Sequence, residues 1–383
     1  MMKDNENVCA YCMGDIFLLT AWVLRRGDAC GACPIGRLEL SLSRRSMPTM
    51  KDVAAKAGVS LASVSRALSA TTDVSDNLRR RIEQAARDLD YTVNLNARSL
   101  RSESSGMIVV LVQDIANAFF PVLLQGIEEQ ARAMGKAVLI ADTASDNELA
   151  ATYGKMLEGR RADGMILLNG NLPRSGAKNS RSLARRFPIV AISERIADAP
   201  IPTVGIDNIG ACFEMVGYLA QIGHKRIVHL MGPADNVLSG ERVEGFRRGI
   251  AHFDCDAPED YIQPSGFTIR SGRQAMGKVL NSMLRPTAVF ASNDESAIGA
   301  IIEAKARGLK VPEDITVVGF DDIEFAQSYD PPLTTVYQPR REMGRKAMEI
   351  LGRLIADPRK PQPDALLDYK LVVRASSAPP PKR

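Results

Sequence analysis

Four side chains between residues 61 and 66 have the chemistry and the spacing to read a nucleic acid. They share one face of a short predicted helix and combine apolar, hydroxylic and cationic groups: Leu61, Ala62, Ser65 and Arg66. An arginine can donate two hydrogen bonds to one guanine, and small apolar side chains can contact thymine methyl groups in the major groove. A helix buried inside a protein would not carry Arg66 on this face, so the pattern favours a helix that contacts DNA.

The segment 49–68 predicts the pair of helices that positions these groups. The first helix has apolar residues at helical spacing: Met50, Val53, Ala54 and Ala57. Gly58 then stands where a positive φ costs least, and Ser60 can cap the second helix. The buried stripe of that second helix is formed by Val64 and Leu68. This is the pattern of a helix-turn-helix, although a plain helix pair in a larger helical domain would share it.

A third helix follows and supports the DNA-binding interpretation. Ser75 is placed to cap it, and its apolar residues keep to one face: Leu78, Ile82, Ala85, Ala86 and Leu89. Three arginines at positions 79–81 project from the other faces. From Lys51 to Arg101 there are nine basic and six acidic residues, a net charge of +3 (9 − 6). This excess is modest, so the prediction rests on the helix pattern more than on charge.

Residues 49–100 resemble the DNA-binding headpiece of the LacI family of bacterial regulators. The resemblance lies in the runs DVAAKAGVSLASVSRAL and LDYTVNLNARSL. It implies that Leu61, Ala62 and Arg66 read bases, and that Ser60 and Ser65 mainly anchor phosphates. The full set of DNA-contacting positions that it implies is Thr49, Ser60, Leu61, Ala62, Ser65, Arg66, Asn94, Ala97 and Leu100.

The same resemblance divides the N-terminal part of the chain into a headpiece, residues 48–93, and a hinge helix or linker, residues 94–105. In the family, paired hinge leucines from two subunits wedge into the minor groove, and Leu100 falls on that position. Val93 departs from the family pattern, because a proline usually precedes the hinge asparagine. The resemblance therefore implies double-stranded operator DNA as a partner and a homodimer as the binding unit, with a tetramer left open.

The first 47 residues contain two CxxC pairs, Cys9–Cys12 and Cys30–Cys33, whose separation suits a zinc site with four thiolates. The apolar run 16–24 between them lacks the polar turns of a small zinc module, and it is too short to span a bilayer. Met47 opens MPTMKDVA, which is how members of the family begin. We expect a start codon assigned too far upstream; a disordered extension and a genuine zinc module are the alternatives.

The chain has 383 residues, with 49 basic and 45 acidic side chains, which predicts about two to three domains and excludes a general nucleic-acid coat. From residue 106 on, apolar runs of strand length alternate with amphipathic helices. Such alternation predicts an α/β core of two doubly wound parallel-sheet subdomains. The predicted strands are 107–112, 137–141, 164–168, 189–192, 227–231, 288–291 and 315–318, and the predicted helices include 121–134, 211–222, 242–252 and 298–307.

The resemblance extends over this region, through motifs such as RRADGMILL, GHKRIVHLMGP and PTAVFASNDESAIGA. It implies a core, residues 106–374, like that of periplasmic sugar-binding proteins. The chain is expected to cross between the two subdomains near 207, near 338 and again in the C-terminal stretch. The proline-rich residues 375–383 are expected to form a disordered tail.

Ligands of open α/β sheets bind beyond the carboxyl ends of the strands. Asp294 follows one predicted strand and could accept sugar hydroxyls, Arg242 opens its predicted helix, and Phe119 and Phe120 could stack on a ring. Matched onto the family, the effector-contacting positions are Phe119, Phe120, Ser193, Asn236, Arg242, Phe267, Asp294 and Asp321. Glu194 is a second carboxylate that could accept an exocyclic amine or face solvent.

The sequence does not favour an enzyme. Its three histidines have no metal-ligand spacing and no neighbouring nucleophile, and it contains no GxGxxG or GxxxxGK[ST] phosphate loop, so no cofactor is expected. A periplasmic solute-binding protein would share the core but not the headpiece. We therefore predict a cytoplasmic transcription repressor. The core motifs most resemble the cytidine-responsive group that controls nucleoside catabolism, which implies a nucleoside effector, with a free pentose or hexose as the alternative.

Overall fold

The computed structural model describes the chain from residue 48 onward, and the described residues form two compact units that divide between Val93 and Asn94. The predictions for residues 1–47, including the four cysteines, and for residues 94–103 of the hinge lie outside the described residues. The described ranges are 48–68, 74–92, 104–144, 146–168, 170–173, 180–196, 199–256 and 258–382.

In the described part of the first unit, three helices pack against one another, α2 (Met50–Ala57), α3 (Leu61–Leu68) and α4 (Asp76–Asp88). Val53, Val64 and Ile82, one from each helix, are fully buried in its core. Gly58 adopts φ +61° and its N–H bonds back to the last turn of α2, as the turn requires. Ser75 stands at the N-cap of α4 but makes no capping hydrogen bond.

The second unit begins with a parallel six-stranded sheet in the order β11-β5-β4-β3-β1-β2. Its strands are β1 (Met107–Val112), β2 (Ala137–Asp142), β3 (Gly164–Leu168), β4 (Ile189–Ile192), β5 (Thr203–Gly205) and β11 (Ala365–Leu366). The helices of this subdomain are α6 (Phe120–Ala133), α7 (Asn147–Glu158), α8 (Ser180–Arg186) and α14 (Arg340–Ala356).

The second subdomain is built on a parallel four-stranded sheet in the order β7-β6-β8-β9. Its strands are β6 (Ile227–Met231), β7 (Ile262–Pro264), β8 (Ala288–Ala291) and β9 (Thr316–Val318). Its helices are α9 (Asn208–Gln221), α10 (Val237–His252), α11 (Ile269–Asn281), α12 (Asp294–Ala306) and α13 (Glu324–Ser328), with a short 3₁₀ turn at Glu259–Tyr261. The two parallel sheets confirm the predicted fold class.

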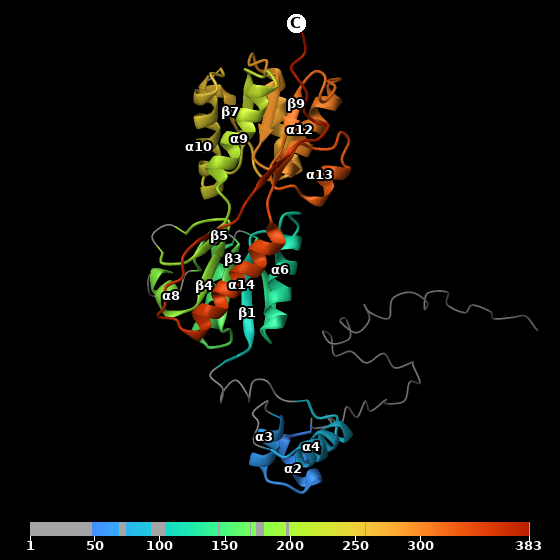
Figure 1. The fold of residues 1–383 in the computed structure, drawn as a ribbon, viewed down its shortest axis with the longest axis vertical. Coiled ribbons are helices and arrows are strands. Elements are labelled where there is room, and N and C mark those ends of the chain that lie inside the picture. The colour runs from blue at the N-terminus through green and yellow to red at the C-terminus, as the bar shows by residue number, and fades with distance from the viewer. Residues whose placement is uncertain are drawn as a thin grey trace, which may run out of the picture. The chain divides into compact units, whose positions relative to one another are not determined.

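Neither subdomain is continuous in sequence. The chain passes from the first to the second between β5 and α9, returns between β10 (Thr335–Tyr337) and α14, and passes over again between β11 and β12 (Lys370–Val372). Figure 1 shows α14, from late in the chain, lying beside α6 and β3 of the first subdomain. β10 and β12 pair antiparallel, so two of the three passages are tied to each other.

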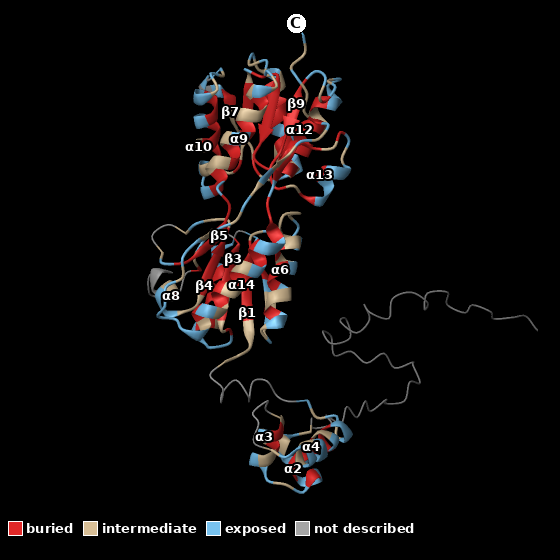
Figure 2. Ribbon diagram, in the orientation of Figure 1, coloured by how far each residue is buried: buried red, intermediate tan, exposed pale blue. Residues whose placement is uncertain are grey.

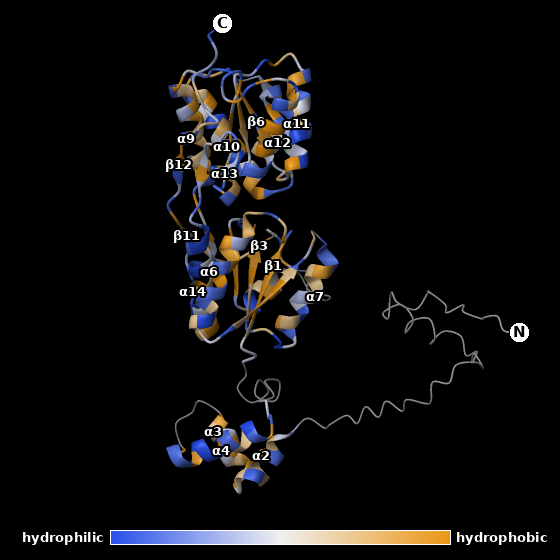
Figure 3. Cartoon of the chain, turned by 90° about the vertical axis from the view of Figure 1, so that its right-hand side faces the viewer, coloured by the Kyte–Doolittle hydropathy of each residue, from blue (hydrophilic) through white to orange (hydrophobic). Residues whose placement is uncertain are grey.

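The central strands carry the core of each subdomain. Five of the six residues of β1 are buried, and β3, β4 and β8 are buried throughout. Figure 2 shows β3 and β4 in red between helices whose outer surfaces are exposed, and Figure 3 shows β1, β3 and β6 in the orange of hydrophobic residues. Continuous apolar strands covered on both faces are typical of parallel sheets.

The expectation that residues 375–383 form a disordered tail is wrong for 375–382, which are described. Ser376 is fully buried, its N–H donates to the carbonyl of Pro332, and its hydroxyl donates to that of Val317 (2.6 Å). The carbonyl of Ala378 accepts from the ring of His224 (2.8 Å). The prolines prevent a regular strand here, but Ser376, Ser377 and Ala378 form hydrogen bonds with the second subdomain.

A cluster of polar bonds fixes the chain where the core begins. The carboxylate of Asp163 accepts from the hydroxyls of Ser104 (2.6 Å) and Ser105 (2.9 Å) and from the N–H of Gly106 (2.9 Å). The ammonium of Lys136 lies 2.7 Å from the same carboxylate. We call these five residues, with Asp163 at their centre, the entry clamp, because they hold the segment that leads into β1.

Candidate DNA-binding surface and effector pocket

Helix α3 presents the predicted base-reading residues to solvent. Leu61 is 43% exposed, and Ala62 and Arg66 are exposed as well, whereas Val64 and Ala67 on the opposite face are buried. Ser65 is half-buried. The apolar face of the helix therefore packs into the headpiece core. Its other face, which is small and partly cationic, is exposed and can enter a DNA groove.

Ser60 and Thr49 stand at the N-termini of α3 and α2. The hydroxyl of Ser60 accepts from the N–H of Ser63 (3.1 Å), so the predicted cap of α3 is present. The N–H and hydroxyl of Thr49 both donate to Asp52 (2.7 Å each). Helix N-termini are favourable positions for phosphate groups. Asn94, Ala97 and Leu100 lie outside the described residues.

A cavity of about 240 Å³ lies between the two subdomains of the core. Six of the eight predicted effector residues line it: Phe119, Phe120, Ser193, Arg242, Phe267 and Asp321. The other lining residues are Gln113, Asp114, Asn117, Leu168, Ile192, Glu194, Pro233, Leu238, Thr268 and Asn293. Both subdomains contribute side chains, so closing one subdomain on the other would change this cavity directly.

Arg242 lies in the second turn of α10, because α10 begins at Val237. The prediction that Arg242 opens its helix is therefore wrong. Its Nε donates to Asn208 (3.2 Å), one Nη donates to the carbonyl of Ser292, and the other lies 3.5 Å from Asp321. The guanidinium also lies 3.8 Å from the ring centroid of Phe320. Most of its hydrogen-bonding capacity is therefore committed within the protein.

Asp321 is the buried carboxylate of the cavity. It adopts φ +112°, a strained conformation for aspartate, and accepts from the amide of Gln338 (2.7 Å). Burial raises the pKa of Asp321 to about 6, although Arg242 and Arg340 oppose the shift. Gln338 belongs to the second passage between the subdomains, so Asp321 connects the cavity to this passage.

Asp294 departs from the prediction that it accepts hydroxyls of the effector. It is fully buried, does not line the cavity, and accepts from the N–H of Ile323 (2.8 Å) and the hydroxyl of Thr335 (2.5 Å). Burial and the nearby Asp321 raise the pKa of Asp294 well above its usual value. The carboxylate ties α12 to the loop after β9, so its role in this conformation is structural.

Asn236 also lies outside the cavity lining, and it caps α10 by accepting from the N–H of Ser239 (3.2 Å). The other helices that begin at the cavity are capped in the same way. Thr268 caps α11 and Asn293 caps α12, while Asn117 accepts from the N–H of Phe119 just before α6 (2.8 Å). Each of these caps satisfies one of the N–H groups that a helix N-terminus leaves without an intrahelical partner.

Sequence reasoning missed several polar lining residues. Gln113, Asp114 and Asn117 follow β1 directly, and Asn293 follows β8. The rule that ligands lie beyond the carboxyl ends of parallel strands could have found all of them.

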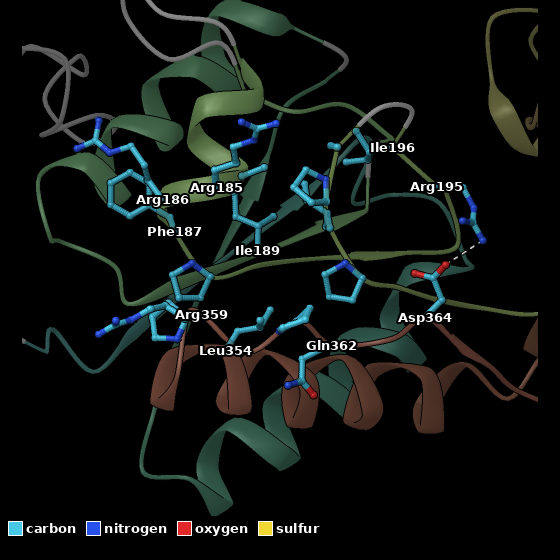
Figure 4. A pocket seen from close by; sticks show the side chains of 18 residues that line it. Arg185, Arg186, Phe187, Ile189, Arg195, Ile196, Leu354, Arg359, Gln362 and Asp364 are labelled. Carbon is cyan, nitrogen blue, oxygen red and sulfur yellow. Dashed lines mark ion pairs between the residues drawn. The ribbon is translucent and has the colours of Figure 1, made fainter.

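A second, larger cavity of about 610 Å³ lies within the first subdomain, between α8, the β4–β5 connection and the end of α14. Figure 4 shows Arg185, Arg186 and Arg359 near it and the ion pair between Arg195 and Asp364 (2.9 Å). None of the predicted site residues lines it.

Two further observations concern the described residues only. No group of three or more His, Cys, Asp or Glu side chains among them could hold a metal ion. None of their helices combines the length and apolar character needed to cross a membrane. Cys212 is buried and Cys255 is half-buried, and both are free thiols.

Comparison with known proteins agrees with both parts of the site. Residues 49–94 match the family of bacterial regulatory proteins described as the lacI family, and residues 216–377 match a periplasmic binding protein-like domain. The transcriptional repressor CytR of Escherichia coli K12 is 39% identical over 330 residues, which cover 86% of this chain and 96% of CytR.

Two solved structures are similar in fold to this chain. The lac repressor dimer bound to operator and the anti-inducer ONPF has a TM-score of 0.77 at 27% identity, covering 86% of this chain and 99% of that one. A LacI-family regulator of Enterococcus faecium with bound ribose has a TM-score of 0.63 at 26% identity, covering 71% and 99%. With a helix-turn-helix followed by this two-subdomain core, and with such identity over most of its length, the chain belongs to the lacI family of bacterial regulatory proteins and is a DNA-binding transcription regulator.

Proposed function

We propose that the chain is a cytoplasmic repressor that binds a palindromic operator as a homodimer. The exposed face of α3, with Arg66 beside Leu61 and Ala62, is the observation that carries this proposal. One headpiece covers too little DNA for specificity in a genome, and a dimer with two-fold symmetry doubles the site. The lac repressor structure, a dimer on operator, supports the same arrangement.

The effector is a small, unphosphorylated, donor-rich molecule, for which a nucleoside is the best candidate. Phe119 and Phe120 lie edge to face with their ring centroids 5.6 Å apart and provide an aromatic wall. Asp321 and Glu194 provide acceptors for hydroxyl or amine groups. The resemblance of the core motifs to the cytidine-responsive group supports cytidine or adenosine, and a bare pentose would leave the aromatic wall unused.

A phosphorylated ligand does not suit this cavity. Among its described lining residues Arg242 is the one Lys or Arg, and it already faces Asp321. Asp114, Glu194 and Asp321 supply three carboxylates against that single cation.

The hinge would transmit the effect of effector binding from the core to the DNA-binding headpieces. Closing the two subdomains on a ligand alters the spacing of the paired linker segments of the dimer, and this spacing decides whether both headpieces fit one operator. The contact of Asp321 with Gln338 lies on this route. The effector either releases the protein from DNA or recruits it, and both outcomes are consistent with this mechanism.

The test has two steps. An operator is first selected from a random duplex library, and its affinity is measured by fluorescence anisotropy. Calorimetry then measures binding of cytidine, adenosine, ribose and 5′-CMP to the protein. We expect a palindromic selected site, heat with the nucleosides and much weaker binding of 5′-CMP. Tight binding of ribose without any nucleoside binding would replace the nucleoside by a sugar, and failure to select any duplex would refute the repressor.

A further inference from the structure

Glu194 is a carboxylate that the fold holds at the cavity by a specific backbone arrangement. It follows β4 after Ser193, which adopts the left-handed φ of +66°, and its own N–H donates back to the carbonyl of Ile192 (2.8 Å). Gly170, with φ +64°, lies against the side chain, and a Cβ at this glycine would overlap with Oε2 of Glu194. Residue 170 must therefore be glycine for Glu194 to take this position.

The protein leaves the carboxylate of Glu194 incompletely satisfied. Among the described residues, Asn236, which also caps α10, donates the side-chain hydrogen bond that this carboxylate receives. Arg242 attracts it at longer range, but the guanidinium makes its direct contacts with Asn208, Ser292 and Asp321. Burial raises the pKa of Glu194 because few protein donors compensate for the lost water. Acceptor capacity thus remains on the side chain where it lines the cavity.

The position of Glu194 indicates which part of a nucleoside it would meet. Glu194, Phe119 and Phe120 all come from the first subdomain, whereas Arg242, Asn293 and Asp321 come from the second. A base stacked on the aromatic wall would therefore lie against the subdomain that carries Glu194, and the polar groups of the second subdomain would remain for its ribose.

We propose that Glu194 selects the effector base by accepting a hydrogen bond from an exocyclic amine. This inference rests on the nucleoside effector proposed above. A carboxylate can only accept, so it favours the 4-amino group of cytosine or the 6-amino group of adenine. The 4-oxo group of uracil would place an acceptor against an acceptor and leave a partly buried charge unpaired. Cavities built to hydrogen-bond one group discriminate strongly against analogues that lack it.

The experiment compares cytidine with uridine by calorimetry on the full chain and on two variants. Glu194→Gln keeps the shape of the side chain but supplies an amide that can donate to a 4-oxo group. Asp235→Asn is the matched control, because Asp235 is an exposed neighbour whose charge acts on Glu194 and which does not line the cavity. Thermal unfolding and operator binding of each variant establish that it is folded.

The wild-type protein should bind cytidine at least about 10-fold more tightly than uridine, as expected for a hydrogen bond to a charged group. Glu194→Gln should lower cytidine affinity about 10-fold and bring the two affinities close together, while Asp235→Asn should leave their ratio unchanged. Equal binding of cytidine and uridine by the wild type, or an unchanged ratio in folded Glu194→Gln, would overturn the role of Glu194 and leave the nucleoside effector standing. Absence of binding with every nucleoside would overturn both.

Discussion

Replacing Asp163 by asparagine removes the charge at the centre of the entry clamp. The carboxylate has only 7% of its side chain exposed, and it accepts bonds from Ser104, Ser105 and Gly106 beside the ammonium of Lys136. An amide keeps one acceptor oxygen but places an NH₂ group opposite these donors. We therefore expect Asp163→Asn to destabilise the core and to loosen the segment that leads into β1.

The pKa of Asp163 gives the size of this effect. Burial alone would raise the pKa, but the bonds from Lys136, Ser104 and Ser105 outweigh it and lower the pKa from 3.8 to about 2. This difference corresponds to about 2 kcal/mol of stability at neutral pH. Because the folded-state pKa is depressed, the contribution is complete above about pH 5 and is lost as the pH falls from about 4 toward 2. About half of it should remain at pH 3.

Urea unfolding followed by circular dichroism at pH 7 and pH 3 measures this contribution. Asp330→Asn is the control, because Asp330 pairs with Lys305 at the same distance of 2.7 Å but has 95% of its side chain exposed. An exposed pair of this kind contributes about 0–1 kcal/mol. Equal losses for Asp163→Asn and Asp330→Asn at pH 7, or a loss for Asp163→Asn that does not shrink at pH 3, would refute the reasoning.

Three further predictions concern the headpiece, the helix packing and the C-terminal segment. Arg66→Ala should weaken binding to the selected operator by about 1–3 kcal/mol and binding to unrelated duplexes much less; equal losses in anisotropy titrations would make it a phosphate anchor only. Gly344→Ala should destabilise the core by about 1–3 kcal/mol in urea, because its Cβ would overlap with the carbonyl of Leu123 where α14 crosses α6; unchanged stability would show that the helices can separate. Removing residues 375–383 should lower the Tm by several degrees, because Ser376 and its partners lose buried hydrogen bonds; an unchanged Tm would show that these bonds contribute nothing.

The sequence was most informative where burial decides structure. The seven predicted strands are all present, with ends that differ by at most one residue, because long apolar runs have little alternative to a covered parallel strand. The short strands β5, β7, β10, β11 and β12 were missed. Each has two or three residues, which is too few to show a period.

Helix starts were less predictable, and this affected the site. The predicted helices 211–222, 242–252 and 298–307 start three to five residues after the helices of the structure, because an apolar repeat marks only where the buried face of a helix begins. The caps Asp207, Asn236 and Asn293 mark the true starts and were readable as such. At the start of a helix, Arg242 would have free N–H groups to donate to a ligand. In the second turn of α10 its side chain is buried.

The roles of the two buried aspartates could not be assigned from sequence. Asp294 and Asp321 both follow strands of the second subdomain, so strand-end reasoning treats them alike. Which carboxylate faces the cavity depends on the loop after β9, where Ile323 donates to Asp294 and the strained backbone of Asp321 turns its side chain toward Arg242. Such details follow from tertiary packing, which periodicity does not encode.

The measurement that tests the central claim most directly is operator affinity with and without a saturating nucleoside, made on the full chain by fluorescence anisotropy. If the cavity between the subdomains controls the headpieces, cytidine should shift the operator Kd by about 5- to 150-fold in one direction, a coupling of about 1–3 kcal/mol. Saturating operator should shift the Kd for cytidine by the same factor, because the coupling is reciprocal. Operator affinity that does not change with bound cytidine would contradict the account, even if both ligands bind tightly.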